Sequence, residues 1–215
     1  PEGGTTPSYG EIKTARRVLT TTRLHVIIRP RGGDFLYSPL ELERMAADID
    51  IARELGADGV VFGCLRPDGS LDTEANAMLM EHAKGLSVTF HRAFDRCADP
   101  RKALEELIAQ GFDRILTSGQ QPTALEGTPL LKELHEQANG RIILLAGCGV
   151  NEQNIATIAQ ATAIHEFHFS ARTAVKSKMM FSNPDVYMGA KDADEDTLNI
   201  TSAERVANTI AQLCK

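Results

Sequence analysis

Six short apolar runs, each followed by a helix-like segment, constrain the fold of this chain more than any other feature of its sequence. Their starts lie roughly 25 to 35 residues apart, about the length of one strand–helix unit in a parallel sheet. The runs are LHVIIRP (24–30), GVVFGCL (59–65), SVTFHRAFD (87–95), RILTSG (114–119), RIILLAGCGV (141–150) and EFHFSA (166–171). The pattern predicts an α/β fold of parallel strands joined by helices.

Each run ends in a polar or glycine-rich tip, which places these tips at the carboxyl ends of the predicted strands. In α/β folds that edge of the sheet is where ligands bind. We therefore predict one binding face that carries Arg29, Asp34, His91, Arg92, Asp95, Ser118, His168 and Ser170.

Length and composition are typical of one globular domain that spans residues 1–215. A net charge of −6 argues against a nucleic-acid or anionic-membrane partner, because both need a basic surface. No apolar run approaches the ~20 residues that span a bilayer, and residues 1–10 do not resemble a secretory signal. The four cysteines are dispersed, as in proteins that keep them reduced. We expect a cytoplasmic protein.

Residues typical of helix N-caps indicate where the helices between the strands begin. The predicted helices begin near Ser38-Pro39, Asp99-Pro100, Thr128-Pro129, Asn151 and the capping box at 201–204. Residues 1–10 and 172–200 interrupt the repeat. We expect the second stretch to be a lid or a disordered loop, with disorder favoured for residues 190–197.

Alternation within the strands indicates which side chains share a face. In EFHFSA, Phe167 and Phe169 suit the face that helices cover, so His168 must point inward with Glu166 and Ser170. The same rule groups Arg29 with His25 and Ile27, and His91 with Thr89. Inward polar residues are costly unless paired, which favours a site.

RPRGGDF (29–35) combines two arginines with an aspartate at the end of a strand. Arg29 and Arg31 can hold a phosphate or carboxylate through paired hydrogen bonds. An internal bridge from either arginine to Asp34 explains the segment equally well. Both interpretations stay open.

TFHRAFD (89–95) supplies the candidate catalytic residues. His91 is a candidate acid or base that Asp95 could orient, with Arg92 beside it and His168 on another strand. The alternative is a hydrogen-bonded core histidine.

LLAGCGVN (144–151) is a glycine-rich turn before a helix, where amide groups favour an anion. With SAR (170–172) at the next tip it predicts a phosphate seat that involves Gly147, Gly149 and Ser170, and Ser118 is a further candidate. The alternative is a tight turn without a ligand.

Cys64, Cys97 and Cys148 follow strand tips, and Met179-Met180 lies in the long loop. Such soft ligands suit copper(I). However, no two of them form a local ligand pair, and small buried hydrophobes are the favoured interpretation.

RPRGGDFLYS, TFHRAFD and LTSG, with EGGTTPS near the start and EFHFSAR near the end, resemble the CutC copper homeostasis family along essentially the whole chain. The resemblance implies a cytosolic TIM-type (β/α)₈ barrel, a homo-oligomer and a role in copper handling, with copper(I) bound by some members. It carries over to the barrel mouth residues Glu2, Arg29, Arg31, Asp34, His91, Arg92, Asp95, Ser118, His168 and Ser170.

The resemblance also implies two more strands ahead of EGGTTPS, and the cysteines proposed as copper ligands belong to them. No residue here therefore inherits a metal-ligand role. Six strands cannot close an eight-stranded barrel, so the strands at 24–30 and 166–171 would have unpaired edges. We expect either a gap that a neighbouring chain fills or a longer protein.

Copper homeostasis is thus the leading function. The alternatives are a barrel enzyme that acts by proton transfer on a phosphorylated or carboxylated small molecule, and a scaffold whose oligomeric surface matters most. The expected partner is a copper ion or a small anionic ligand.

Overall fold

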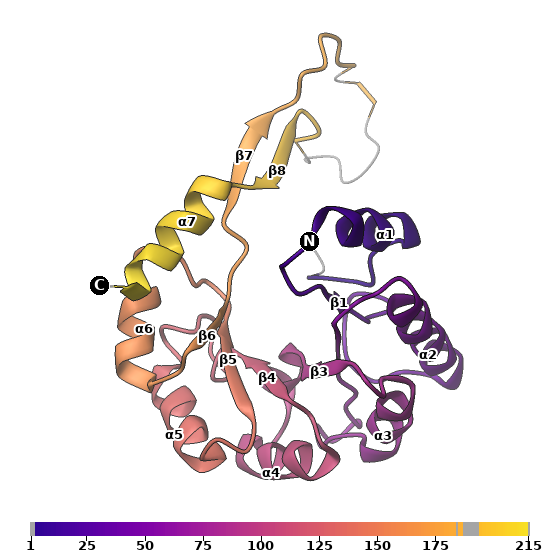
Figure 1. Ribbon diagram of the computed structural model, residues 1–215, viewed down its shortest axis with the longest axis vertical. Helices are drawn as coiled ribbons and strands as arrows, with labels where there is room; N and C mark the ends of the chain where they lie inside the picture. Colours follow the sequence, from indigo (N-terminus) through magenta and orange to yellow (C-terminus); the bar gives the residue numbers. More distant parts are fainter. Residues whose placement is uncertain (1–2, 184, 187–193, 215) are drawn as a thin grey trace.

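A curled sheet of six parallel strands forms the centre of the molecule and confirms the predicted α/β architecture. The computed structural model describes residues 3–183, 185–186 and 194–214. The strands, in spatial as well as chain order, are β1 (His25–Ile27), β2 (Gly59–Phe62), β3 (Ser87–Phe90), β4 (Arg114–Thr117), β5 (Ile143–Gly147) and β6 (Glu166–His168). Each pairs in parallel with the next, and within the described residues β1 and β6 do not pair with each other. The sheet is part of a TIM-type barrel (Figure 1).

Helices α2 to α6 follow the outer face of this sheet (Figure 1). The α-helices are α1 (Tyr9–Val18), α2 (Pro39–Glu54), α3 (Thr73–His82), α4 (Pro100–Gln110), α5 (Thr128–Ala138), α6 (Ile155–Thr162) and α7 (Ala203–Ala211), and the 3₁₀ helices are η1 (Arg92–Arg96) and η2 (Gln212–Cys214). In the parts of the chain described, no helix combines the length and the apolar character needed to cross a bilayer.

Local capping explains where two of the predicted helices begin. Ser38 forms the expected capping box: its Oγ accepts from the Glu41 amide at 3.4 Å, and the Glu41 carboxylate accepts from the Ser38 amide at 2.8 Å. Asp99 caps α4, and Gly111 ends it with a φ of 83°, a conformation that glycine adopts without strain.

Two predicted helix starts are wrong by a few residues. Helix α6 begins after Asn154, not Asn151, because the Asn154 side chain accepts from the Asn151 amide at 2.9 Å and holds residues 151–154 in turns. Helix α7 begins after Ser202, whose Oγ accepts from the Arg205 amide at 3.3 Å. The expected capping box at 201–204 is therefore shifted by one residue and lacks a glutamate at its third helical position.

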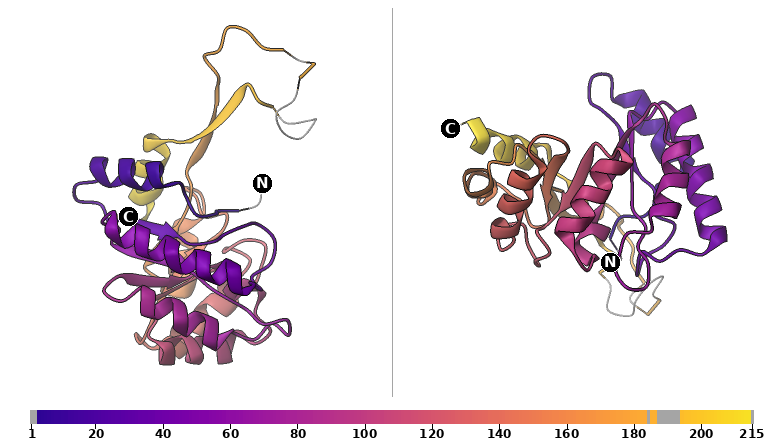
Figure 2. Two further views of the ribbon diagram at one scale, coloured as in Figure 1. Left: turned by 90° about the vertical axis from the view of Figure 1, so that its right-hand side faces the viewer. Right: turned by 90° about the horizontal axis from the view of Figure 1, so that it is seen from below.

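The two ends of the stretch 172–200, expected to be part of a lid or a disordered loop, form strands instead. Strands β7 (Arg172–Lys176) and β8 (Thr197–Thr201) pair antiparallel in a hairpin that stands away from the body (Figure 2). Thr197, expected to be disordered, begins β8, and residues 194–196 lie just before it; residues 190–193 lie outside the described residues. Alternation within β8 leaves Leu198 and Ile200 exposed on one face. The low apolar content of the whole stretch makes this alternation hard to recognise in the sequence.

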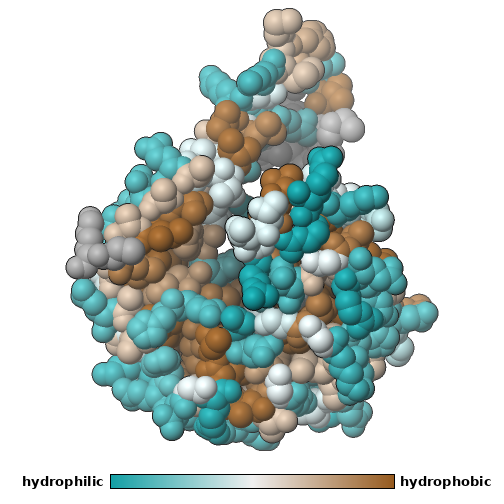
Figure 3. Space-filling model, in the orientation of Figure 1, coloured by the Kyte–Doolittle hydropathy of each residue, from teal (hydrophilic) through white to brown (hydrophobic). Residues whose placement is uncertain are grey.

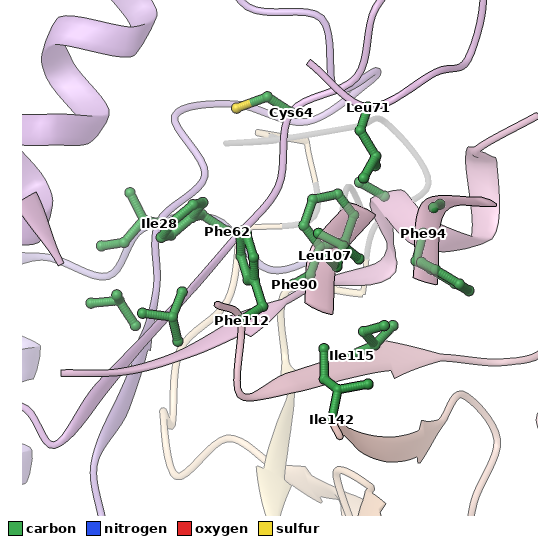
Figure 4. Packing of buried hydrophobic residues seen from close by; sticks show 14 of the residues in the cluster. Ile28, Phe62, Cys64, Leu71, Phe90, Phe94, Leu107, Phe112, Ile115 and Ile142 are labelled. Carbon is green, nitrogen blue, oxygen red and sulfur yellow. The ribbon is translucent and has the colours of Figure 1, made fainter. Parts of the chain in front are cut away.

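The hydrophobic core lies between the sheet and its helices. Phe62 and Phe90, on neighbouring strands, each meet the ring of Phe112 edge-on at 5.5 Å between ring centroids (Figure 4). Both strand phenylalanines are fully buried. Because Phe90 points outward to the helices, its neighbour His91 must point to the opposite face of the sheet.

Candidate functional site

A cleft of about 1740 Å³ runs along the inner face of the sheet to the carboxyl ends of the strands. Figure 3 shows the surface hollowed between the side of the molecule that carries α7 and the side that carries α1, with hydrophilic residues around the hollow. Its walls include residues of β1 to β6 and of the loop after β1. The cleft therefore lies where the sequence places the binding face.

Strands β1, β3 and β6 bring three of the predicted residues to this cleft. Arg29, His91 and His168 all line it, whereas Phe167 on β6 packs against the core. Asp34, Arg92 and Asp95 also line it. Alternation along β6 thus puts His168 in the cleft and Phe167 in the core, as the sequence predicts.

Arg29 links the loops at the mouth of the cleft. Arg29 is 7% exposed, and its guanidinium donates to the carbonyl oxygens of Gly4 at 3.2 Å and Gly33 at 2.9 Å. It also lies over the ring of Phe35, 5.1 Å from the centroid. These contacts join the two loops, so Arg29 has a structural role as well as lining the cleft. Glu2, carried over by the resemblance, lies outside the described residues.

Arg31 forms the internal bridge that the sequence offers as one of two interpretations. Its Nε donates to Glu41 Oε1 at 2.6 Å, and its Nη2 lies 3.0 Å from Asp34 Oδ1. A further bond from Nη2 to the Leu36 carbonyl measures 2.8 Å. Arg31 does not line the cleft. An anion-binding role for it stays a prediction, but most of its donors already have protein acceptors.

His91 is an almost buried imidazole, 3% exposed, beneath the ring of Phe35 at 4.9 Å between centroids. Burial, and then the Arg29 guanidinium, lower its pKa to about 3, so the ring is neutral at pH 7. Because Nδ1 accepts from the Ala93 amide at 3.3 Å, the ring hydrogen lies on Nε2. Within the described part of the chain, Nε2 has no hydrogen-bond partner.

Asp95 does not orient His91 as the sequence suggests. Its carboxylate, 7% exposed, instead accepts from Arg92 Nε at 2.6 Å, Thr117 Oγ1 at 2.6 Å, the Ser118 amide at 3.0 Å and the Gln120 amide at 3.3 Å. The same carboxylate accepts from Ser118 Oγ at 3.1 Å, and that hydroxyl accepts from Arg92 Nη2 at 3.1 Å. Asp95 thus joins η1 to the loop after β4.

His168 is exposed to the cleft on β6, although the surrounding walls remove part of its solvation. That desolvation, and then the Arg92 guanidinium, lower the pKa of His168. Gly147 leaves room for it: a Cβ at this position would lie 2.5 Å from Leu116 Cδ1 and 3.2 Å from His168 Cβ. The observed reason for a glycine here is therefore close packing.

Gly149 and Ser170, the other members of the predicted phosphate seat, line a separate pocket of about 190 Å³ between the loops after β5 and β6 and helix α7. Glu152 lies in this pocket and pairs with Arg205 at 3.1 Å. A carboxylate in the wall disfavours a phosphate. The predicted seat is thus divided between two places in the fold and stays a prediction.

A polar layer at the amino ends of the strands was not among the predicted site residues. Arg114 Nε lies 2.7 Å from Glu166 Oε2, and its Nη1 donates to Ser87 Oγ at 2.9 Å. Burial, and then Arg114, lower the pKa of His25 in the same layer. Alternation along RILTSG, which puts Arg114 on the face of Leu116 and Ser118, is the signal that could have found it.

Cys64, Cys97 and Cys148 are free thiols, and they do not form a cluster. Cys64 and Cys97 are buried, and burial raises the pKa of Cys64 strongly and that of Cys97 to about 12. Cys148 is partly exposed and donates to the Pro122 carbonyl at 3.1 Å. In the described part of the structure, no group of three or more His, Cys, Asp or Glu side chains is placed to hold a metal ion.

The sequence profile of the CutC family matches residues 1–173. A CutC family protein of Bacteroides thetaiotaomicron is 66% identical over 211 residues, which are 98% of this chain and 85% of the relative. The human protein described as a copper homeostasis protein cutC homolog is 48% identical over 214 residues, 98% of this chain and 78% of the relative.

Solved structures show the same likeness. The crystal structure of a CutC protein from Streptococcus agalactiae has a TM-score of 0.75 and 42% identity, and the match covers 78% of this chain and 82% of that one. An aldolase called QR15 has a TM-score of 0.58 at 19% identity, with coverage of 74% and 73%. The second likeness shows the fold alone.

Proposed function

Because this chain belongs to the CutC family, we propose that it acts in copper homeostasis and binds copper(I). The family match is the observation that carries this proposal, together with the copper homeostasis role named for the human relative.

Proton-transfer catalysis has less support from the geometry. Among the described residues no carboxylate bonds to His91, and its pKa near 3 makes it a poor base.

Cys148 is the described cysteine best suited to take up copper(I). A thiolate is the metal-binding form of cysteine, and burial opposes its formation at Cys64 and Cys97. Cys148 is partly exposed at the end of β5, so it has access to solvent.

We expect Cys148→Ser to lower the affinity for copper(I) at least tenfold in a titration against a competing chelator, because a hydroxyl is a hard ligand. Cys97→Ser, which removes a buried thiol of raised pKa, is the matched control and should bind like the parent protein. Equal binding by the parent and by a variant with every cysteine replaced would refute copper(I) binding through thiols.

We also propose a cytoplasmic location. Three free, uncrosslinked cysteines support it, since cytosolic reductants keep thiols reduced. Cell fractionation beside a cytoplasmic marker tests this, and recovery with secreted or membrane proteins would contradict it.

We further propose that the β7–β8 hairpin joins copies of this chain in a homo-oligomer. A two-stranded hairpin is marginally stable alone in water, and this one stands away from the body (Figures 1 and 2). On one face Leu198 lies opposite Val175, and Ile200 follows on the same side. Their exposed fractions of 54%, 39% and 47% support an apolar contact surface.

The double variant Leu198→Asp, Ile200→Asp should reduce the mass measured by light scattering after gel filtration to that of a monomer. Charges on this face would have to be desolvated in the contact. Asn199→Asp, on the opposite face of β8, is the control and should keep the oligomer. A parent protein that is monomeric at every concentration tested would refute the proposal.

A further inference from the structure

The charge balance of the cleft differs in sign from that of the whole chain. The chain carries a net charge of −6, yet seven arginines and four acidic side chains line the cleft. An excess of guanidinium groups in a concave site raises the local concentration of anions.

Every carboxylate of the cleft already has an arginine partner. Asp34 pairs with Arg31, Asp58 with Arg16 at 2.8 Å, and the last two, Asp95 and Glu166, with Arg92 and Arg114. In contrast, Arg96 and Arg172, both exposed, form no ion pair with a described carboxylate. The cleft is therefore arranged to receive negative charge and offers little to a cation.

His91 provides a buried hydrogen-bond donor to the cleft. It is a cleft residue, it is 3% exposed, and its Nε2–H finds no acceptor in the described part of the chain. A buried donor without an acceptor destabilises the protein, and a ligand oxygen that accepts from it would remove that cost. Phe35 packs against the ring, with 4.9 Å between the ring centroids.

Arg92 has donors left for a ligand. Its Nε is bonded to Asp95 and its Nη2 to Ser118, while the side chain remains 42% exposed at the cleft. Arg92 also lies near enough to His168 to lower its pKa. A guanidinium fork near the His168 imidazole is well suited to an oxyanion.

We propose that the cleft binds a small organic anion whose phosphate or carboxylate group is held by Arg92 and His168, with His91 as the buried donor beneath. The organic part fits the apolar wall that Leu65, Leu116 and Leu145 provide. This site is separate from Cys148 and does not depend on copper, so failure of the copper proposal leaves it standing.

Calorimetric titration with phenyl phosphate, benzoate and benzyl alcohol tests the proposal, because the three probes share a ring and differ in charge. We expect saturable 1:1 binding of at least one anion and none of the alcohol. The preferred anion identifies the phosphate or carboxylate group. No saturable binding of either anion, or equal binding of the alcohol, would overturn the proposal.

Arg92→Gln should weaken binding of the preferred anion at least tenfold, while copper(I) affinity stays unchanged. Asp95 keeps its bonds to Thr117, Ser118 and Gln120 in this variant, so the local fold should persist. Arg101→Gln is the matched control, since Arg101 pairs with Glu133 outside the cleft. Equal affinities in the two variants would show that the anion binds elsewhere and would overturn the assignment.

Discussion

Replacing Asp95 with alanine is expected to lower the free energy of unfolding by about 2–3 kcal/mol, the cost of leaving several donors without their common acceptor. The carboxylate is almost buried and joins η1 to the loop after β4 through Arg92, Thr117, Ser118 and Gln120. Without it, an arginine and several donors lose their common acceptor. Urea denaturation of the parent and the variant measures the difference.

Two further variants make this result specific to Asp95. Asp95→Asn keeps the shape and one carbonyl acceptor, so its loss should be smaller than that of the alanine variant. Glu81→Ala removes an exposed pair with Lys84 and should change stability by less than about 1 kcal/mol. A loss below about 1 kcal/mol for Asp95→Ala would contradict the structural role assigned here.

Acid should destabilise the protein through His91. Its pKa is about 3 in the folded state, against 6.5 in the unfolded chain. Above pH 6.5 both states are neutral and stability is unaffected. As the pH falls from 6.5 towards 3, only the unfolded state gains a proton at this site, so about 1.4 kcal/mol of stability is lost per pH unit.

His91→Phe isolates this effect, because a phenyl ring suits the aromatic surroundings of Phe35 and Phe90 and does not titrate. Between pH 6.5 and pH 5, the parent should lose about 2 kcal/mol more than the variant. Parallel curves for the parent and His91→Phe would mean that the imidazole is not held neutral by burial.

The strand–helix repeat and the face of each strand residue could be predicted from the sequence, because both depend on local periodicity. Phe167 packs against the core and His168 faces the cleft, as alternation requires. The hairpin formed by Arg172–Lys176 and Thr197–Thr201 could not be predicted in this way. Its pairing joins segments about twenty residues apart, and the alternation within β8 covers only five residues of a stretch that is otherwise poor in apolar residues.

The candidate residues could be predicted, but their pairings could not. Arg29 and Arg31 look equivalent in RPRGGDF, yet one faces the cleft and the other bonds to Glu41 on α2. Likewise, Asp95 is four residues from His91, but its acceptors point to Thr117 and Ser118 across the sheet. The hydrogen-bond partner of each side chain depends on which strands are neighbours in the sheet. The sequence of one strand end does not contain that information.

The imidazole resonances of His91 and His168 test most directly whether the polar strand tips converge on one anion-binding cleft. In a titration with the anion preferred in calorimetry, followed by proton–nitrogen NMR at pH 7, both rings should shift along one saturation curve, starting from a neutral His91 with its hydrogen on Nε2. A bound anion that leaves both rings unchanged, or moves only one of them, would contradict this convergence.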